Sequence, residues 1–270
     1  MEHNNNEYTL FKRPSFYCRC DGNDISSNFI STVGGFWWTF EDTLTGPFAE
    51  SVSGNSSYSY VTSSDGINGT QKTIANGKVG KALELKAESG PYATNINMQS
   101  SSVNMIYTDG FTFTTWIRPT GSMPTTVEFR YRTYDGVFLV GFEAPPAVSA
   151  EIFWTWAANN WTAYLYDSGS NQLMTDTIPF VPVVGTWYFM RFSYDKVAGK
   201  FIYQVNNGTE TSSISTVSYS PTTAVSALLT LRIDGPGGVL DIDELNFYDY
   251  VLSPAEVTTL WNSGNGQTYP

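Results

Sequence analysis

The stretch GGVLDIDELNFYDYVLSPAEVTTLW (residues 237–261) places carboxylates among apolar and aromatic residues and changes character at Ser253. From that point it predicts a short helix, because Ser253 can cap the first turn, Pro254 suits its first position and Glu256 stands three residues after the cap. Gly264 can end this helix. The carboxylates before Ser253 suit three roles: acid–base catalysis, metal ligation, or a solvated strand end with neither role.

The chain that precedes this stretch predicts strand after strand, with turn signals between them. GFTFTTWIRP (110–119) alternates between two faces, and YDKVAGKFIYQVNNG (194–208) indicates two strands joined by a tight turn. Aromatic residues make up 16% of the chain and charged residues only 14%, a mixture that suits strands and polar loops. About a dozen short strands with one terminal helix predict an all-β fold, a two-sheet antiparallel sandwich or jelly roll.

The charge of the chain restricts its partners. The formal net charge is −11 at pH 7. Nucleic acid and anionic membrane surfaces both require clustered Lys and Arg, so we expect neither as a partner. Excess carboxylate does favour a hard cation such as calcium.

Residues 1–34 differ from the rest and are interpreted as an N-terminal arm, followed by a sandwich domain over 35–270. The arm contains His3, Cys18 and Cys20, too few ligands for a zinc site. Its start has no apolar segment of the kind found in secretory signals. We therefore expect a protein that stays in the cell that made it or leaves by another route, such as phage lysis, unless a signal has been removed.

Four phrases occur in the order typical of one family. They are GKVGKALEL (77–85), DGFTFTTWIRP (109–119), GTWYFMRFSYDKVAGKFIYQVNNG (185–208) and LDIDELNFYDYVLSPAEVTTLW (240–261). Together they resemble the concanavalin A-like lectin/glucanase superfamily, in its laminin G-like branch. The resemblance extends over about residues 36–262. The matching positions are Gly80 to Leu83, Trp116, Trp187, Ile242 to Leu245, and Leu252 to Val257. It implies the concanavalin A-like jelly roll, a fold that carries lectins, adhesins, hydrolases and inert modules alike.

The resemblance also gives the opening stretch a place in the fold. It makes 239–250 the final core strand and 253–261 a helix that closes the edge of the sandwich. Leu245 and Phe247 would then belong to the core, and Trp261 would cap it.

Family members often bind a structural calcium between the first and last strands. The resemblance therefore implies a calcium site made by Glu41 or Asp42 from FWWTFED together with Asp243 and Glu244, which it places at the start of the last strand. The alternative is that these residues are solvated acids at a strand end.

The sequence predicts no catalytic site. The glucanases of this superfamily use a Glu-x-Asp-x-x-Glu strand, which places paired carboxylates on one face. Asp241 and Asp243 share a face, but Glu244 points the other way and position 246 is Asn. A Ser/His/Asp triad would have to use His3 in the arm.

The stretch EIFWTWAANNWTAYLYD (151–167) is the candidate for carbohydrate contact. Trp154 and Trp156 share one face of a strand, Trp161 follows a turn, and Asn160 could bind hydroxyl groups. The alternative is that these aromatic side chains fill the core of the sandwich.

We interpret the chain as a non-catalytic structural or adhesion protein with a lectin-like domain. The first hypothesis is a bacteriophage virion surface component: a capsid decoration, fibre or tail-associated adhesin. Its partners would be other virion or assembly proteins, bound through the arm in an oligomer, and a cell-surface glycan. The alternative is a carbohydrate-binding module of a secreted or cell-surface bacterial protein.

Overall fold

The computed structural model describes much of the chain after Gly35. The described residues are 35–38, 59–61, 69–87, 95–100, 110–134, 148–167, 172–206, 208, 211–214, 226–235, 237–248 and 250–267. The predicted arm, residues 1–34, lies outside them, as do Glu41 and Asp42.

The described chain is built almost wholly of strands. In chain order they are β1 (Gly35–Trp38), β2 (Ser59–Val61), β3 (Gly69–Ile74), β4 (Ala82–Ala87), β5 (Asn95–Ser100), β6 (Gly110–Pro119), β7 (Thr126–Tyr134), β8 (Val148–Ala157), β9 (Asn160–Asp167), β10 (Gln172–Pro179), β11 (Tyr188–Asp195), β12 (Lys200–Val205), β13 (Thr211–Ile214), β14 (Ser226–Asp234) and β15 (Val239–Tyr248). A helix, α1 (Pro254–Trp261), and a 3₁₀ turn, η2 (Asn262–Gly264), follow them.

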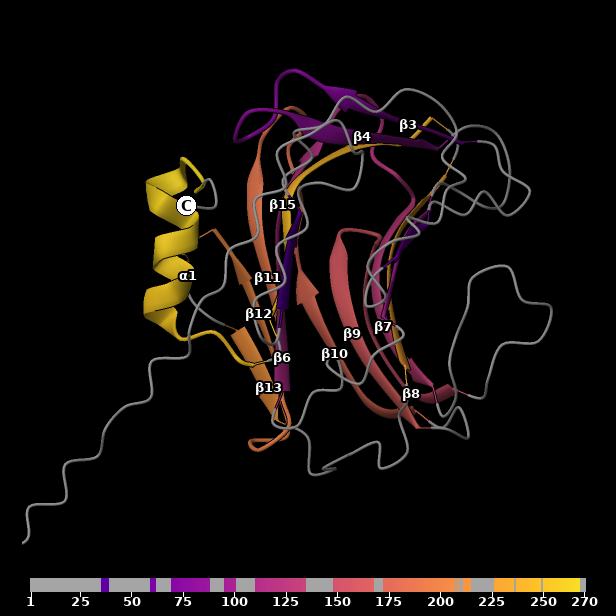
Figure 1. Ribbon diagram of the computed structural model, residues 1–270, viewed down its shortest axis with the longest axis vertical. Coiled ribbons are helices and arrows are strands. Elements are labelled where there is room, and N and C mark those ends of the chain that lie inside the picture. Colours follow the sequence, from indigo (N-terminus) through magenta and orange to yellow (C-terminus); the bar gives the residue numbers. More distant parts are fainter. Residues whose placement is uncertain are drawn as a thin grey trace, which may run out of the picture.

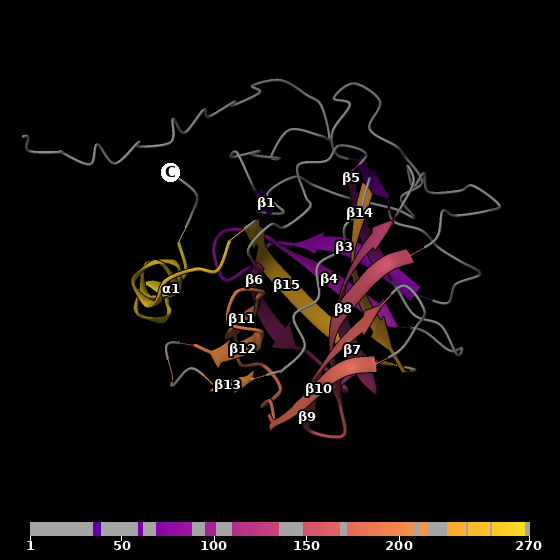
Figure 2. The same ribbon diagram turned by 90° about the horizontal axis from the view of Figure 1, so that it is seen from below.

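These strands form two sheets that face each other (Figures 1 and 2). Sheet A has the order β13-β12-β11-β6-β15-β4-β3, and β1 also pairs with β15. Sheet B has the order β10-β9-β8-β7-β14-β5-β2. All of these strand pairs are antiparallel. The prediction of a two-sheet antiparallel sandwich with a C-terminal helix is confirmed.

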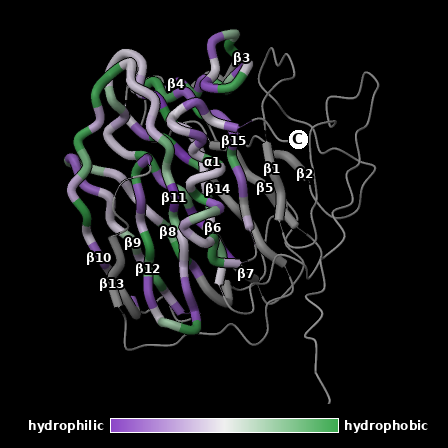
Figure 3. The backbone as a smooth tube through the Cα atoms, turned by 90° about the vertical axis from the view of Figure 1, so that its left-hand side faces the viewer, coloured by the Kyte–Doolittle hydropathy of each residue, from purple (hydrophilic) through white to green (hydrophobic). Residues whose placement is uncertain are grey.

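The core between the sheets is rich in aromatic side chains. Hydrophobic and hydrophilic residues alternate along the strands, as Figure 3 shows, so each strand turns one face to the core. Trp154 of sheet B lies among Phe113, Phe192 and Phe201 of sheet A, with ring centroids 6.0, 5.5 and 5.7 Å away. All four side chains are buried. Rings that contact at these separations interlock the two sheets and fix which face of each strand points inward.

The hairpin predicted over 194–208 is confirmed by the pairing of β11 with β12. Its turn is fixed by Asp195, whose Oδ1 accepts a hydrogen bond from the backbone N–H of Ala198 at 2.8 Å. Gly199 follows at φ +60°, a backbone conformation that glycine adopts without steric cost.

Strand β15 contains a bulge in its middle. Leu240 and Ile242 are buried in the core, and so is Leu245, although it lies three residues after Ile242 rather than two. The pairing with β6 shifts register between Asp243 and Asn246, and Glu244 has φ +47°. The extra residue restores the inward direction of Leu245 after the phase of the apolar pattern has changed.

The bulge also marks a change of neighbour along β15. Before it, β15 pairs with β4, with Ile242 opposite Leu83. After it, β15 pairs with β1, with Leu245 opposite Trp38. The expectation that Leu245 belongs to the core is confirmed, whereas the side chain of Phe247 lies outside the described residues.

Helix α1 begins as its sequence predicts. The Ser253 Oγ accepts a hydrogen bond from the Glu256 N–H, and the Glu256 carboxylate accepts one from the Ser253 N–H at 2.7 Å, which completes a capping box. Burial alone would raise the pKa of Glu256, but hydrogen bonds from Ser253 and Tyr250 hold it below its usual value. The helix ends at Trp261, followed by the cap residue Asn262 in the left-handed conformation, and not at Gly264 as expected.

The helix covers the outer face of sheet A (Figure 1). Val257 and Leu252 are buried against Trp116 and Phe189 of that face, and Trp261 packs beside them half-buried. Trp261 therefore caps this outer cluster. The expectation that it caps the core between the sheets is wrong. The described helices are too short to span a membrane.

A buried arginine binds the segment that precedes the helix. Arg191 of β11 is 1% exposed, and its Nη2 donates a 2.6 Å hydrogen bond to the carbonyl of Leu252. Its Nη1 donates to Gln204, while the Oγ1 of Thr112 accepts from the Leu252 N–H at 3.1 Å. These contacts satisfy the backbone of Leu252, so the segment before α1 can lie on the sheet.

We expect Trp154→Ala to lower the free energy of unfolding by about 3–5 kcal/mol, because it removes a buried indole and leaves a cavity. Phe153→Ala is the matched control: it changes the next residue of the same strand, which points outward, and should cost about 1 kcal/mol or less. Urea denaturation followed by circular dichroism measures both. Trp154→Phe serves if the alanine variant does not fold, and equal losses at positions 153 and 154 would contradict the assigned faces.

Candidate functional site

The candidate site is the outer face of sheet B, and it begins with the alternation along β8 and β9. The side chains of Trp154, Trp156 and Trp161 are 1%, 5% and 2% exposed. All three rings belong to the core, so the expectation that they stack on sugar is wrong. The alternative interpretation, that these aromatic side chains fill the core of the sandwich, is confirmed.

Asn160 has a local role instead of the predicted contact with hydroxyl groups. It closes the two-residue turn between β8 and β9, where Ala158 and Asn159 have φ +49° and +65°. Its Nδ2 donates a hydrogen bond to the carbonyl of Ala158 at 2.9 Å. The amide group is therefore engaged in the turn.

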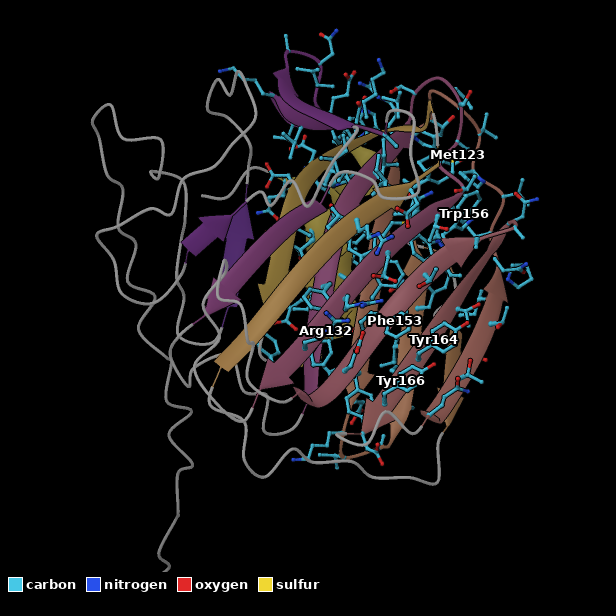
Figure 4. All side chains as sticks on the ribbon, turned by 90° about the vertical axis from the view of Figure 1, so that its right-hand side faces the viewer. Met123, Arg132, Phe153, Trp156, Tyr164 and Tyr166 are labelled. Carbon is cyan, nitrogen blue, oxygen red and sulfur yellow. The ribbon has the colours of Figure 1, made fainter. Side chains whose placement is uncertain are left out.

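The residues between the buried tryptophans form a stacked aromatic surface. Phe153 of β8 lies directly opposite Tyr164 of β9, with ring centroids 4.7 Å apart and planes inclined by 26°. Tyr166 stacks on Phe153 at 5.7 Å and 1°. All three side chains are half-buried, and Figure 4 shows them side by side on the outer face of the sheet. We call Phe153, Tyr164 and Tyr166 the aromatic platform.

Arg130 of β7 extends this platform. Its guanidinium carbon lies 4.8 Å from the centroid of the Phe153 ring. The same guanidinium pairs with Glu128 at 2.9 Å and with Glu151 at 3.0 Å, and Glu151 also pairs with Arg132 at 3.2 Å. Partly exposed pairs of this kind add little stability, so their main effect is to hold the guanidinium beside the Phe153 ring.

The charges on this face are balanced. Besides the pairs around Arg130, β14 contributes Arg232, whose Nη2 lies 2.8 Å from Asp234. On the described part of this face three arginines thus meet three carboxylates, on a protein whose net charge is −11. The face is therefore much closer to neutral than the chain as a whole.

Hydroxyl groups border the platform. The Tyr166 hydroxyl donates to Gln172 at 3.1 Å, and the hydroxyls of Thr162 and Thr177 lie 3.2 Å apart. Tyr164 makes no hydrogen bond through its hydroxyl within the described part of the chain, and its ring edge is partly open to solvent. The face thus combines apolar ring surfaces with groups that can donate and accept hydrogen bonds.

The sequence carried a signal for this face that its interpretation missed. Along β8 and β9 the tryptophans occupy one set of alternate positions, and the tyrosines with threonines occupy the other. Tyr and Thr keep a polar atom that needs water or a partner, which favours the outer position.

The predicted calcium ligands are only partly within the described chain. Asp243 lies at the bulge in the middle of β15, not at the start of the strand as expected, and it is fully buried. Its Oδ2 accepts a hydrogen bond from the Val79 N–H and its Oδ1 from the Glu244 N–H, each at 2.8 Å. Glu244 is 3% exposed. These residues are therefore not a solvated strand end.

Whether calcium joins them depends on Glu41 and Asp42, outside the described residues. Within the described residues no group of three His, Cys, Asp or Glu side chains is placed to hold a metal ion. Strand β1 does end at Trp38, opposite Leu245 and so beside Glu244. The calcium site stays a prediction.

Asp241 makes a structural contact as well. Its Oδ2 accepts hydrogen bonds from Nε and Nη2 of Arg118 at 2.8 and 2.6 Å. Burial raises the pKa of Asp241 above its usual value, although Arg118 opposes the shift. Asp241 and Asp243 thus serve a salt bridge and a backbone loop, and the expectation of no catalysis stays a prediction.

Comparison with known proteins places this geometry in a family. A sequence model described as the concanavalin A-like lectin/glucanases superfamily, of the laminin G type, matches residues 92–258, more than half of the chain. The chain belongs to this superfamily. No curated protein matches its sequence.

Solved structures share the fold at low sequence identity. The binding domain of Paraclostridial Mosquitocidal Protein 1 is 12% identical, with a TM-score of 0.50 over 73% of this chain and 48% of that one. The botulinum neurotoxin serotype D binding domain is 10% identical, with a TM-score of 0.51 over 76% and 48%. The chain therefore spans about half the length of these domains. At such identities the likeness shows the fold alone.

We expect Asp243→Ala to lower the free energy of unfolding by about 2–4 kcal/mol, because it leaves two backbone N–H groups without their acceptor. Thermal and urea denaturation in excess chelator measure this loss in the absence of calcium. The full loss is expected under these conditions, because it comes from the two hydrogen bonds and not from a bound ion. If chelator also destabilises the wild type, bound calcium contributes to its stability. An Asp243→Ala variant as stable as the wild type would contradict the role assigned to Asp243.

Proposed function

We propose that this chain is a non-catalytic binding module that binds carbohydrate across the outer face of sheet B. The observation that carries the proposal is the aromatic platform of Phe153, Tyr164 and Tyr166, stacked and half-exposed beside the guanidinium of Arg130. Three rings held in nearly parallel planes form an apolar surface that is already ordered before a ligand arrives, which lowers the entropic cost of binding.

The chemistry of the face suits a sugar. The apolar C–H face of a pyranose can pack on Phe153 and Tyr164, while its hydroxyl groups need both donors and acceptors at the rim. Arg130, Glu151 and the Tyr164 hydroxyl supply them. Because the arginines and carboxylates balance, this face favours neutral sugars over strongly charged polymers.

Within the described residues, the outer face of sheet A offers no comparable surface. Helix α1 and the segment before it cover its central strands, and Arg191 is buried beneath them. A ligand that approaches the sandwich broadside therefore has sheet B as the open face among the described strands.

The setting of this module stays a prediction. The two hypotheses from the sequence, a bacteriophage virion surface protein and a secreted or cell-surface bacterial module, use the same binding face. They differ in the role of residues 1–34. The virion proposal is supported by the separate composition of that segment. Because β1 begins at Gly35, a chain truncated before that residue tests the proposal.

We expect Phe153→Ala and Tyr164→Ala each to weaken glycan binding about tenfold, which corresponds to about 1.4 kcal/mol of lost ring contact. A glycan array with the intact chain identifies the sugar, and calorimetry on that sugar measures the affinities. Tyr250→Ala, an exposed tyrosine away from this face, is the matched control and should bind as the wild type does. Unchanged binding by both platform variants, with their folds intact, would exclude this face.

We expect a chain that begins at Gly35 to keep the fold and the melting temperature, because β1 begins there and pairs with β15. The same truncation should abolish self-association if residues 1–34 serve assembly. Circular dichroism and light scattering measure the two properties. If the truncated chain unfolds, residues 1–34 are part of the sandwich, and if it associates like the full chain, they are not an assembly element.

A further inference from the structure

A small cavity lies between the two sheets, on the inner side of sheet B. Its lining residues come from β8, β9 and β10, the edge strand of sheet B, and from β12 of sheet A. Its volume is about 10 Å³. The residues that line it are Trp154, Trp161, Ala163, Asp176, Ile178, Phe201 and Tyr203.

Three of the lining residues carry a buried hydrogen-bond donor that has no partner within the described part of the chain. The Nε1 atoms of Trp154 and Trp161 and the hydroxyl of Tyr203 are buried and make no hydrogen bond within the described residues. An indole N–H can only donate, and a buried donor without an acceptor costs about 1–3 kcal/mol. Burial raises the pKa of Tyr203 far above its usual value, so the phenol keeps its proton.

The neighbouring Trp156 shows that the strand can satisfy such a group. Its Nε1 donates a 2.9 Å hydrogen bond to the carbonyl of Phe180. Other buried polar atoms without a partner occur elsewhere among the described residues, but three donors gather on residues that line this one cavity, two of them on the adjacent strands β8 and β9.

An acceptor stands on the same lining. Asp176 of β10 pairs with Ala163 of β9, which in turn pairs with Trp154 of β8. Cross-strand neighbours share a face, so the half-buried Asp176 side chain points inward beside the small Ala163. The Asp176 carboxylate makes no hydrogen bond or ion pair within the described part of the chain. An inward charge on an edge strand can also prevent pairing with other chains, but that role does not account for the three donors.

We propose that this cavity binds one hydroxyl oxygen, from a water molecule or from the terminal hydroxyl of a small polyol. The volume is close to the room that a single water oxygen needs. A hydroxyl oxygen can accept from both indole N–H groups and donate to the Asp176 carboxylate. A cation would meet three donors and an anion would meet Asp176, so a neutral O–H group fits the lining best.

Nuclear magnetic resonance of the indole N–H groups tests this site in the intact chain. Resonances are assigned with Trp154→Phe, Trp161→Phe and Trp156→Phe. For resident water, the Nε1–H groups of Trp154 and Trp161 should show cross-peaks to a long-lived water, and that of Trp156 should not. For a polyol, ethylene glycol should shift the first two resonances saturably and leave the third in place. Neither water cross-peaks nor a shift would overturn the proposal.

Two variants at Asp176 separate ligand binding from protection of the edge. Asp176→Ala removes the acceptor and should weaken the water cross-peaks or the ethylene glycol shift at least severalfold. Asp176→Asn keeps a carbonyl oxygen and should retain them. Thr177→Ala, on the outer face of the same strand, is the matched control. If Asp176→Ala leaves both indole signals as in the wild type, Asp176 is not part of the site.

Discussion

The packing of Trp154 between the two sheets is the constraint on which the rest of this structure depends. Its indole contacts aromatic rings from three strands of sheet A, and it is almost completely buried. Because neighbouring residues of a strand point to opposite faces, burying Trp154 sends Phe153 outward. The direct pairing of β8 with β9 then places Tyr164 next to Phe153. The outer aromatic platform is thus a geometric consequence of the inner aromatic core.

The same constraint leaves the two outer faces with different roles. Sheet A is covered by the C-terminal helix, which is held by the capping box at Ser253 and by Arg191 under Leu252. Sheet B carries arginines, carboxylates and rings that are satisfied by one another and remain partly exposed. Among the described residues one outer face is covered and the other is open to a ligand, and this asymmetry supports the proposed function.

Much of the fold could be predicted from the sequence, because its signals are local. The capping residues Ser253 and Glu256 identify a helix start, and alternation such as that in GFTFTTWIRP identifies a strand. The bulge at Glu244 was missed, although the apolar pattern changes phase between Ile242 and Leu245. That change was visible, but the choice between a bulge and a strand end depends on β1 and β4, which pair with β15 on the same side.

The site was harder to predict, because large aromatic residues stand on both faces of β8 and β9. Alternation separates them into two sets but does not say which set faces the core. The chemistry of the tryptophans suited sugar contact as well as the core, and the volume between the sheets decides in favour of the core. Glu41 and Asp42 lie outside the described residues, so the calcium site stays a prediction.

A crystal structure of the chain with a glycan bound tests the proposed binding face most directly. We predict that the sugar lies on the outer face of sheet B, with a pyranose ring over Phe153 or Tyr164 and its hydroxyl groups near Arg130. A sugar bound elsewhere on the sandwich, with Phe153, Tyr164 and Tyr166 free of contact, would contradict it.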